Sequence, residues 1–583
     1  MHNSRKIMRR EAQANSVLPD DMPAILRRVY ANRNISNADE LDYSVQGLLP
    51  LTLMKGIEAA AVIVADAVIA QQRILIVGDY DADGATSTAL VLRALRGFGA
   101  SHTDYLVPNR FEYGYGLTPA IVEVAATRKP DLIITVDNGI SSIEGVSAAH
   151  AHAIRVVITD HHLAGRELPA ADAIVNPNQP GCAFPEKSIA GVGVAFYLML
   201  ATRARLRELG WFSAAARDEF NMASLLDLVS LGTVADVVPL EKNNRLMVQL
   251  GLQRIRKRQC GVGIQALMQA AAKDITQCTS ADFGFFVAPR LNAAGRLDDM
   301  SAGIECLLTD DMQTAQQLAE QLHLLNQERR QIESGMLDAA MLHLDELIAN
   351  LDDEQLPLGL CLYDASWHQG VVGLLASRIK ERFHRPVIAF ADAGTDDTDT
   401  NELKASARSI PGLHIRDVLD AVATRHPGLI EKFGGHAMAA GLSLDKSNYA
   451  DFKSAFEAEV ARQLNADALE NIILSDGAID SPEMSLQTAA TIRMAGPWGQ
   501  QFPEPVFDDV FEIINWRIVG AKHLKMQLRL QHTAPALDAI AFNHTDADLP
   551  AGCELIHAAY RLDINEYRGV RKLQLIVEYI EAA

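Results

Sequence analysis

Paired cysteines, a signal sequence and long apolar runs are all missing from this sequence of 583 residues. None of its six cysteines belongs to a CxxC pair, which argues against a zinc knuckle or a disulfide framework and favours a reducing, cytoplasmic location. The basic start, MHNSRKIMRREAQ, lacks the apolar core of a signal peptide. The most apolar long stretch, residues 57–77, contains Glu58, Asp66 and Arg73. It therefore fits a buried helix followed by a strand, and we expect no membrane association.

Positive charge is also scarce, because 53 Lys and Arg face 74 Asp and Glu for a formal net charge of −21. Taken alone, this balance argues against a protein that coats nucleic acid over its whole surface, since phosphate binding favours Lys and Arg. Carboxylates gathered around a metal ion would place negative charge where the cation cancels it. At roughly 100–200 residues per domain, the length predicts three or four domains.

Short apolar runs alternate with amphipathic helical patterns in the first third of the chain. We predict strands at residues 73–78, 103–107, 131–136, 154–159 and 172–176. Continuous apolar runs suit strands that are buried on both faces. The alternation predicts βαβ units, and therefore an α/β domain built on a parallel sheet.

The remainder of the chain shows three further patterns. Residues 189–299 are mostly helical, and an uninterrupted apolar spacing of three and four predicts a long helix over 311–350. A second α/β pattern follows, with strands at 358–364 and 386–390, a helix between them, a polar loop at 391–402 and a helix at 451–464. From about residue 472, short alternating strands predict a small all-β barrel of the OB type. We therefore expect segments 1–50, 51–310, 311–350, 351–466 and 467–583.

Acidic and imidazole side chains follow three of the predicted strands. Asp79, Asp81 and Asp83 follow the first strand, Asp137 the third, and Asp160, His161 and His162 the fourth. Ligands of open α/β sheets bind at the carboxyl ends of the strands, so these groups should converge. They would repel one another unless a cation lay among them. Mixed Asp and His ligation suits Mn²⁺ and allows Mg²⁺ or Zn²⁺, and this many ligands favours two ions.

Two other interpretations of these motifs deserve comparison. Asp and Asn often follow strands simply because they form turns and cap helices. Turn formation or capping can explain any one of these motifs, but it explains poorly why all three occur together at strand ends. The opening DxDxDG also matches an EF-hand loop, but Leu90 stands where that loop needs Glu, and the motif follows a buried strand.

The motifs DYDADG, VDNG and DHH, in this order and spacing, resemble those of the DHH phosphoesterase family. GTVADVVPL (232–240) is similar to the next motif of that family. PRLNAAGR (289–296), SARS (406–409) and GGHAMAAG (434–441) resemble motifs of its RecJ branch. The resemblance covers roughly residues 40–583 and implies a DHH catalytic domain, a smaller DHH-associated α/β domain joined by a long helix, and a C-terminal OB-like β-barrel.

The resemblance also implies roles for individual residues. The implied metal ligands are Asp81, Asp83, Asp137, His161 and Asp236, with Asp79, Asp160 and His162 as further ligands or as residues that orient them. The implied contacts to the substrate strand are Arg110, Asn292, Arg296, Ser406, Arg408 and His436. For Arg110 a surface salt bridge is an equal alternative, and for His436 the alternative is a tight turn with a core histidine. Trp367 could line the groove or pack within a strand-to-helix turn.

The predicted barrel carries a candidate strand-binding face. Lys525, Gln527 and Arg529 alternate with Met526, Leu528 and Leu530, so one face would be basic and the other would belong to the core. A basic face is what an OB-fold needs to bind a single strand, and Trp516 and Tyr567 could stack on bases. An ordinary solvated strand face explains the alternation equally well.

By this resemblance, we expect an exonuclease that shortens single-stranded DNA from its 5′ end, releases 5′-mononucleotides with two Mn²⁺ or Mg²⁺ ions, and serves repair and recombination. The catalytic cleft should lie between the two α/β domains. A helicase and a single-strand-binding protein are the expected partners of a monomer. The alternatives are a DHH phosphodiesterase of oligonucleotides or cyclic dinucleotides and a non-catalytic DNA-binding scaffold.

Overall fold

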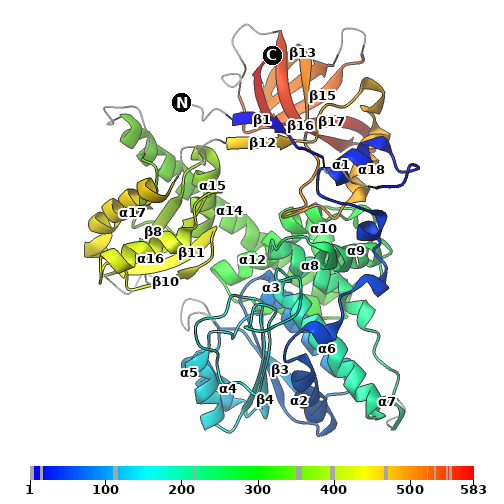
Figure 1. Cartoon of the computed structure of the whole chain (residues 1–583), viewed down its shortest axis with the longest axis vertical. Helices are drawn as coiled ribbons and strands as arrows, with labels where there is room; N and C mark the ends of the chain where they lie inside the picture. The colour runs from blue at the N-terminus through cyan, green and yellow to red at the C-terminus, as the bar shows by residue number, and fades with distance from the viewer. Residues whose placement is uncertain are drawn as a thin grey trace. The chain divides into compact units, whose positions relative to one another are not determined.

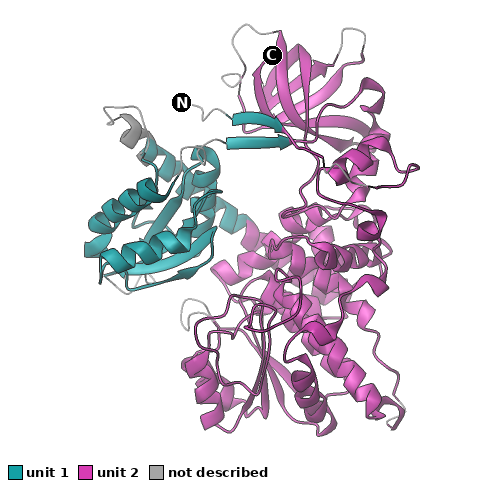
Figure 2. Cartoon of the chain, in the orientation of Figure 1, with its two compact units in different colours: residues 1–8, 327–474 teal, residues 9–326, 475–583 magenta. Residues whose placement is uncertain are grey.

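The computed structural model describes residues 5–12, 17–108, 116–214, 217–349, 357–393, 401–464, 471–520, 523–530, 534–545, 549 and 554–583. The chain forms two compact units (Figure 2). One unit contains residues 327–474 and the first eight residues, and the other contains residues 9–326 and 475–583. The boundary falls inside the long helix α14 (Met312–Ala349), which the sequence predicted over 311–350.

A five-stranded parallel sheet lies at the centre of the larger unit, as predicted. Its strands are β2 (Ile74–Gly78), β3 (Thr103–Leu106), β4 (Leu132–Val136), β5 (Arg155–Thr159) and β6 (Ala173–Val175). They lie in the order β3-β2-β4-β5-β6, and each neighbouring pair is parallel. Every residue of β2 and β4 is buried, which explains their nearly continuous apolar sequences.

Helices cover both faces of this sheet (Figure 1). Ile74 and Ile76 share a core with α2 (Ile57–Ile69), α3 (Ala82–Phe98) and α6 (Gly191–Glu208). Leu75 and Val77 share another core with α4 (Pro119–Thr127) and α5 (Ile143–Ala151). Successive side chains of a strand point to opposite faces, so each strand contributes to both cores.

The predicted helical region after the sheet is confirmed. Its main helices are α8 (Leu226–Ala235), α9 (Lys242–Arg256), α10 (Val262–Ala270), α12 (Ala288–Leu297) and α13 (Ser301–Leu308). A π-helical turn, η6 (Phe283–Val287), leads into α12. Within the described ranges no single helix is long and apolar enough to cross a membrane; the bent pair Val45–Leu53 and Ile57–Ile69 matches a span by length and composition only.

The smaller unit contains a mixed sheet in the order β10-β11-β9-β8-β7. Its strands are β7 (Leu360–Tyr363), β8 (Val387–Asp392), β9 (Glu402–Arg408), β10 (Lys432–Gly435) and β11 (Ala439–Asp445). Helices α15 (Val372–Phe383), α16 (Ile415–Arg425) and α17 (Tyr449–Gln463) accompany it. The two predicted strands and the helix between them are present. Most of the predicted polar loop, residues 394–400, lies outside the described residues.

A closed barrel with the order β13-β14-β15-β17-β16 forms the C-terminal part, which confirms the predicted barrel. Its strands are β13 (Phe507–Val519), β14 (His523–Arg529), β15 (Leu537–Phe542), β16 (Leu555–Tyr567) and β17 (Val570–Ala582). In β14, Leu524, Met526 and Leu528 are buried in the barrel. Lys525 and Arg529 are partly exposed and Gln527 is exposed, so the predicted alternation is present.

The expectation of an all-β C-terminal region is wrong in one respect, because α18 (Leu486–Ala495) precedes the barrel. The Ser485 side chain caps this helix by accepting a hydrogen bond from the Thr488 N–H, and Ala489 and Ile492 are buried. The capping serine and the helical spacing of the two apolar residues are both present in the sequence, but the strand patterns on either side favoured an all-β interpretation. The strand β12 (Asn471–Ser475) pairs with β1 (Arg5–Arg9) and does not join the barrel.

The N-terminal helix α1 (Ala24–Ala31) packs on the C-terminal part of the same unit. The Arg33 guanidinium donates to both oxygens of Asp476 at 2.9 and 3.0 Å, and both side chains are almost fully buried. The Asn32 amide donates to Asp476 as well, at 2.9 Å. The Tyr30 ring lies 6.0 Å from that of Trp498. Residues from the two ends of the chain therefore share one hydrophobic core.

This buried ion pair predicts a measurable loss of stability. We expect Asp476→Asn to lower the free energy of unfolding by about 3–5 kcal/mol, because it leaves the Arg33 charge buried without its counter-charge. The matched control is Asp20→Asn, which breaks the exposed Arg27–Asp20 pair and should cost about 1 kcal/mol or less. Urea unfolding followed by fluorescence measures both, and equal losses would contradict the prediction.

Candidate metal centre

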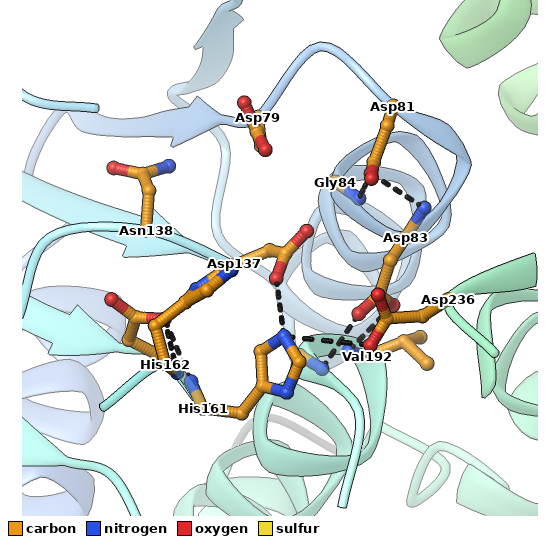
Figure 3. Close-up of polar contacts among 12 residues, drawn as sticks. Asp79, Asp81, Asp83, Gly84, Asp137, Asn138, His161, His162, Val192 and Asp236 are labelled. Carbon is orange, nitrogen blue, oxygen red and sulfur yellow. Dashed lines mark hydrogen bonds and ion pairs between the residues drawn. The ribbon is translucent and has the colours of Figure 1, made fainter. Parts of the chain in front are cut away.

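The carboxyl ends of β2, β4 and β5 bring acidic and imidazole groups together. Asp79, Asp137 and Asp160 directly follow these strands, and all three are buried. Figure 3 shows one space with these side chains around it: Asp79, Asp81, Asp83, Asp137, His161 and Asp236. Three overlapping groups in this space, each with ligand atoms within 4.8 Å of one another, could hold a metal ion. They are Asp79–Asp81–Asp137, Asp83–His161–Asp236 and Asp137–His161–His162.

Asp81 lies here because it caps α3. Its backbone is extended, and its Oδ1 accepts hydrogen bonds from the N–H groups of Asp83 at 2.9 Å and Gly84 at 3.0 Å. The first N–H groups of a helix have no partner within the helix, so a capping Asp is strongly favoured there. This carboxylate is therefore fixed at the start of α3, beside the ends of the strands.

Asp83 points instead at the start of another helix. Its two oxygens accept hydrogen bonds from the N–H groups of Gly191 at 2.7 Å and Val192 at 3.0 Å, at the N-terminus of α6. The positive end of the helix dipole stabilises such a carboxylate. A Cβ atom on Gly191 would lie 2.6 Å from Asp137 Oδ1, so only glycine allows α6 to approach this closely.

His161 lies between two carboxylates. Its Nε2 is 3.1 Å from Asp137 Oδ1 and 3.5 Å from Asp236 Oδ2, and Asp236 ends α8 (Figure 3). His161 Nε2 and Asp236 Oδ2 are buried and make no hydrogen bond within the part of the chain that the structure describes. A buried imidazole nitrogen and a buried carboxylate oxygen that face each other without a hydrogen bond fit a divalent cation between them.

The pKa values in this space reflect burial first and repulsion between the carboxylates second. Burial, followed by the charge of neighbouring carboxylates, raises the pKa of Asp83 and that of Asp236 to about 8 each. The same causes raise the pKa of Asp137 well above its ordinary value. Burial lowers the pKa of His161 and so favours the neutral imidazole, which is the form that binds metal ions. Without a cation, protons must offset part of the negative charge.

Asp160 and His162 form a separate ion pair beside the cluster. Burial alone would raise the pKa of Asp160, but the hydrogen bond and the charge of His162 outweigh it, and the net shift is downward. His162 Nδ1 donates to Asp160 Oδ1 at 2.7 Å, and this bond raises the pKa of His162 to about 9 against the effect of burial. Asp160 also accepts the N–H of Ile140 at 2.9 Å, which joins the loops after β4 and β5.

Two asparagines outside the predicted site residues hold the DHH segment in place. The Asn176 amide donates to the backbone oxygen of His162 at 3.0 Å, and the Asn178 amide donates to that of His161 at 2.6 Å. Both belong to the segment NPN that follows β6. A turn of this composition after a strand offered the only hint, because nothing in one sequence shows which backbone oxygen an amide will reach.

The predicted strand contacts are distributed over both units. Arg110 lies outside the described residues, and Asn292 and Arg296 lie on α12 in the larger unit. Asn292 Oδ1 accepts the N–H of Ala82 at 2.8 Å, beside the metal cluster. Trp367, in the smaller unit, is buried, which favours the packed turn over a groove wall.

Ser406, Arg408 and His436 also belong to the smaller unit, and their convergence on the metal cluster stays a prediction. His436 is exposed in the tight turn between β10 and β11, where its N–H donates to the Ala439 oxygen at 2.8 Å. It is therefore not a core histidine. Burial lowers the pKa of Arg408. A Cβ atom on Gly373 would lie 2.9 Å from Arg408 Nη2 and 3.2 Å from Ser406 Oγ, so both side chains lie at the start of α15.

Comparison with known proteins agrees with this arrangement. Residues 73–233 match the model of the DHH family, N-terminal domain, residues 358–462 match the DHHA1 domain, and residues 475–579 match the RecJ OB domain. A crystal structure of RecJ in complex with Mn²⁺ from Thermus thermophilus superposes with a TM-score of 0.77 at 29% identity, covering 96% of this chain and 76% of that one.

Two curated relatives match over almost their whole length. The chain is 54% identical to the single-stranded-DNA-specific exonuclease RecJ of Dickeya dadantii over 574 residues, which cover 98% of each chain. It is 51% identical to the protein of the same name from Escherichia coli over 581 residues, which cover 100% of each chain. The chain therefore belongs to the RecJ family, whose catalytic domain is of the DHH type.

Proposed function

We propose that this protein is an exonuclease that shortens single-stranded DNA from its 5′ end and releases 5′-mononucleotides. The observation that carries this proposal is the buried cluster of carboxylates and imidazoles around His161 Nε2. The relatives matched over nearly their full length are named single-stranded-DNA-specific exonucleases, and their solved homologues contain Mn²⁺ or Mg²⁺. Either ion suits the oxygen-rich ligand set of this chain.

The metal ligands in this proposal are Asp81, Asp83, Asp137, His161 and Asp236. When bound, two divalent ions stabilise the negative charge on the attacking and leaving oxygens of an in-line displacement. The protein contributes the geometry, because α3 and α6 fix Asp81 and Asp83 through backbone hydrogen bonds. Asp79 completes the ring of carboxylates, while Asp160 holds a proton on His162 Nδ1 and fixes the orientation of that ring.

The strand contacts in this proposal are Arg296 on α12, Ser406, Arg408 and His436 in the smaller unit, and Arg110. Ser406 and Arg408 are supported by their position at the start of α15, a helix of 12 residues. The N-terminus of a helix together with a guanidinium is a favourable site for a phosphate. His436 is exposed in its glycine-rich turn, which supports a contact with a phosphate.

The outer face of the barrel offers a second strand-binding surface. Lys525 on β14 lies opposite Arg517 on β13, and Gln527 lies opposite Asn515. Arg529 lies 3.4 Å from Glu512, which offsets part of its charge. Trp516 is 46% exposed, but it lies opposite the buried Met526, so its ring belongs to the other face of the strand pair and not to this basic face. The side chain of Tyr567 lies outside those described. This surface is basic along two paired strands, as a track for a single strand requires.

We further propose the domain division 1–50, 51–310, 311–350, 351–466 and 467–583. The first segment contains α1, which packs on the last domain through Arg33 and Asp476. We also propose a monomer that acts in the cytoplasm with a helicase and a single-strand-binding protein. DNA processing by the named relatives supports these partners, since duplex must be opened before a single-strand exonuclease can act.

Two alternative functions fit less well. A DHH phosphodiesterase of oligonucleotides or cyclic dinucleotides has no use for a domain that matches the RecJ OB domain over residues 475–579. A non-catalytic DNA-binding scaffold has no need for the full set of buried carboxylates at the strand ends. Release of nucleotides from a long single strand that depends on added Mn²⁺ separates all three functions.

The metal cluster predicts that removing one carboxylate will lower activity without lowering the stability of the metal-free protein. We expect Asp236→Asn to reduce the hydrolysis rate at least about 10²-fold, because a ligand is lost. In EDTA its melting temperature should equal or exceed that of the wild type, because the buried carboxylates repel less. The increase in melting temperature on adding Mn²⁺ should shrink. Near-normal activity, or a melting temperature in EDTA far below that of the wild type, would contradict the assignment.

Polarity and strandedness follow from the proposed function. We expect a single strand to be shortened from its 5′ end only and a blunt duplex to resist, because base pairing holds the terminal nucleotide out of the site. Digestion time courses on strands labelled at either end, with Mn²⁺ or Mg²⁺, measure both properties. Early release of mononucleotides from a 3′ label would overturn the polarity, and equal rates on duplex would overturn the strand preference.

The barrel face predicts a change in salt dependence. Each lost phosphate contact should reduce the slope of log affinity against log salt by about 0.7 for a single strand. We therefore expect Arg517→Gln and Lys525→Gln each to reduce the slope by this amount for long strands. Lys572→Gln, an exposed position on β17 of the same barrel, is the control and should leave it unchanged. Three unchanged slopes would show that this face serves another purpose.

A further inference from the structure

Asn292 lies on α12, at the point where this helix crosses the metal-binding loop. We propose that Asn292 positions the metal ligands Asp81 and Asp83, in place of contacting the substrate strand. The inference rests on the proposed function, because it concerns the site assigned there to the two ions. Its basis is the hydrogen bond that Asn292 Oδ1 accepts from the N–H of Ala82 at 2.8 Å.

Asn292 completes the cap of α3. The N–H groups of Asp83 and Gly84 donate to Asp81 Oδ1, and the N–H of Ala85 donates to the Asp81 backbone oxygen at 2.9 Å. The N–H of Ala82 is the remaining donor of this first turn, and Ala82 is buried at 1% exposure. A buried N–H group without an acceptor is costly. Asn292 therefore satisfies the one donor of this turn that neither the carboxylate nor the backbone oxygen of Asp81 accepts.

Loss of the Asn292 oxygen would act directly on Asp81. Without the Asn292 oxygen the Ala82 N–H loses its acceptor, and rotation of the neighbouring Asp81 carboxylate is one way to replace it. That rotation would withdraw the carboxylate from the metal cluster and release the N–H groups of Asp83 and Gly84. In this proposal Asn292 holds the backbone between Asp81 and Asp83 in place, and the Asp81 carboxylate therefore stays in the metal cluster.

Gly295 provides a second contact between α12 and the metal-binding loop. A Cβ atom at this position would lie 1.7 Å from the backbone oxygen of Tyr80, so the helix touches the loop directly. Residues three apart share one face of a helix, so Asn292 and Gly295 both contact the loop that carries Tyr80 and Ala82. Arg290, on another face of α12, donates to the Ala270 oxygen at 3.2 Å and to His323 Nδ1 at 2.9 Å. The helix is thereby anchored to α10 and α14.

The experiment compares two substitutions of Asn292 in the full-length chain. Mn²⁺ binding is measured by calorimetry in the absence of DNA, and binding of a labelled single strand is measured in EDTA. We expect Asn292→Ala to weaken Mn²⁺ binding about 10- to 100-fold. Asn292→Asp should keep most of the affinity, because it retains the acceptor oxygen. Both variants should bind the strand in EDTA like the wild type, because Asn292 makes no contact with DNA in this proposal.

Three further variants serve as a second probe and as controls. Gly295→Ala should also weaken Mn²⁺ binding, because its Cβ displaces the same loop. Gly335→Ala, at a helical glycine with open space around its Cβ position, is the matched control and should bind Mn²⁺ normally. Asn243→Ala removes an amide oxygen that accepts the Leu49 N–H at 3.1 Å, between segments other than α12 and the metal loop. It should affect melting temperature without affecting Mn²⁺ affinity.

The outcomes separate this inference from the proposed function. Normal Mn²⁺ affinity of Asn292→Ala would overturn the positioning role. So would weaker strand binding in EDTA for Asn292→Ala with a larger loss for Asn292→Asp, because a negative charge repels the phosphates that an amide would bind. If the wild-type protein itself took up no Mn²⁺ without DNA, the proposed metal site would fail, whatever the variants showed.

Discussion

The metal centre imposes one demanding constraint, because several carboxylates must be buried together in one small space. Each ionised carboxylate loses its hydration and repels the others, and the raised pKa values of Asp83, Asp137 and Asp236 express both costs. The protein reduces these costs with backbone N–H groups at the starts of α3 and α6. What remains is an excess of negative charge that two divalent ions can neutralise.

This constraint explains the layers around the sheet. The acidic groups must follow parallel strands, because only parallel strands bring several carboxyl ends to one edge. Helices must then begin at the same edge, so that their N–H groups face the carboxylates. The small residue Gly191 allows one of these helices to approach. α12 adds a third support from outside the sheet, through Asn292.

A separate interaction joins the ends of the chain. Arg33 and Asp476 are 443 positions apart, yet both are almost fully buried and form two hydrogen bonds. The aromatic rings of Tyr30, Trp498 and Phe502 pack beside them. The Leu240 N–H donates to the Gln500 oxygen at 2.8 Å, which ties the C-terminal part to the helices around the metal centre. The segment that precedes the barrel is therefore packed against the helices that surround the metal centre.

The five parallel strands, the long helix α14, the barrel and the strand ends that carry Asp79, Asp137 and Asp160 could be predicted from the sequence. These features are local, because apolar periodicity and the order of motifs specify them within short windows. Three features became visible only in the folded chain: α1 packs on the last domain, Asn176 and Asn178 hold the histidines, and Asn292 caps α3. These contacts join residues that are far apart in sequence, or join a side chain to one particular backbone group. A short stretch of sequence does not show which donor will meet which acceptor once the chain is folded.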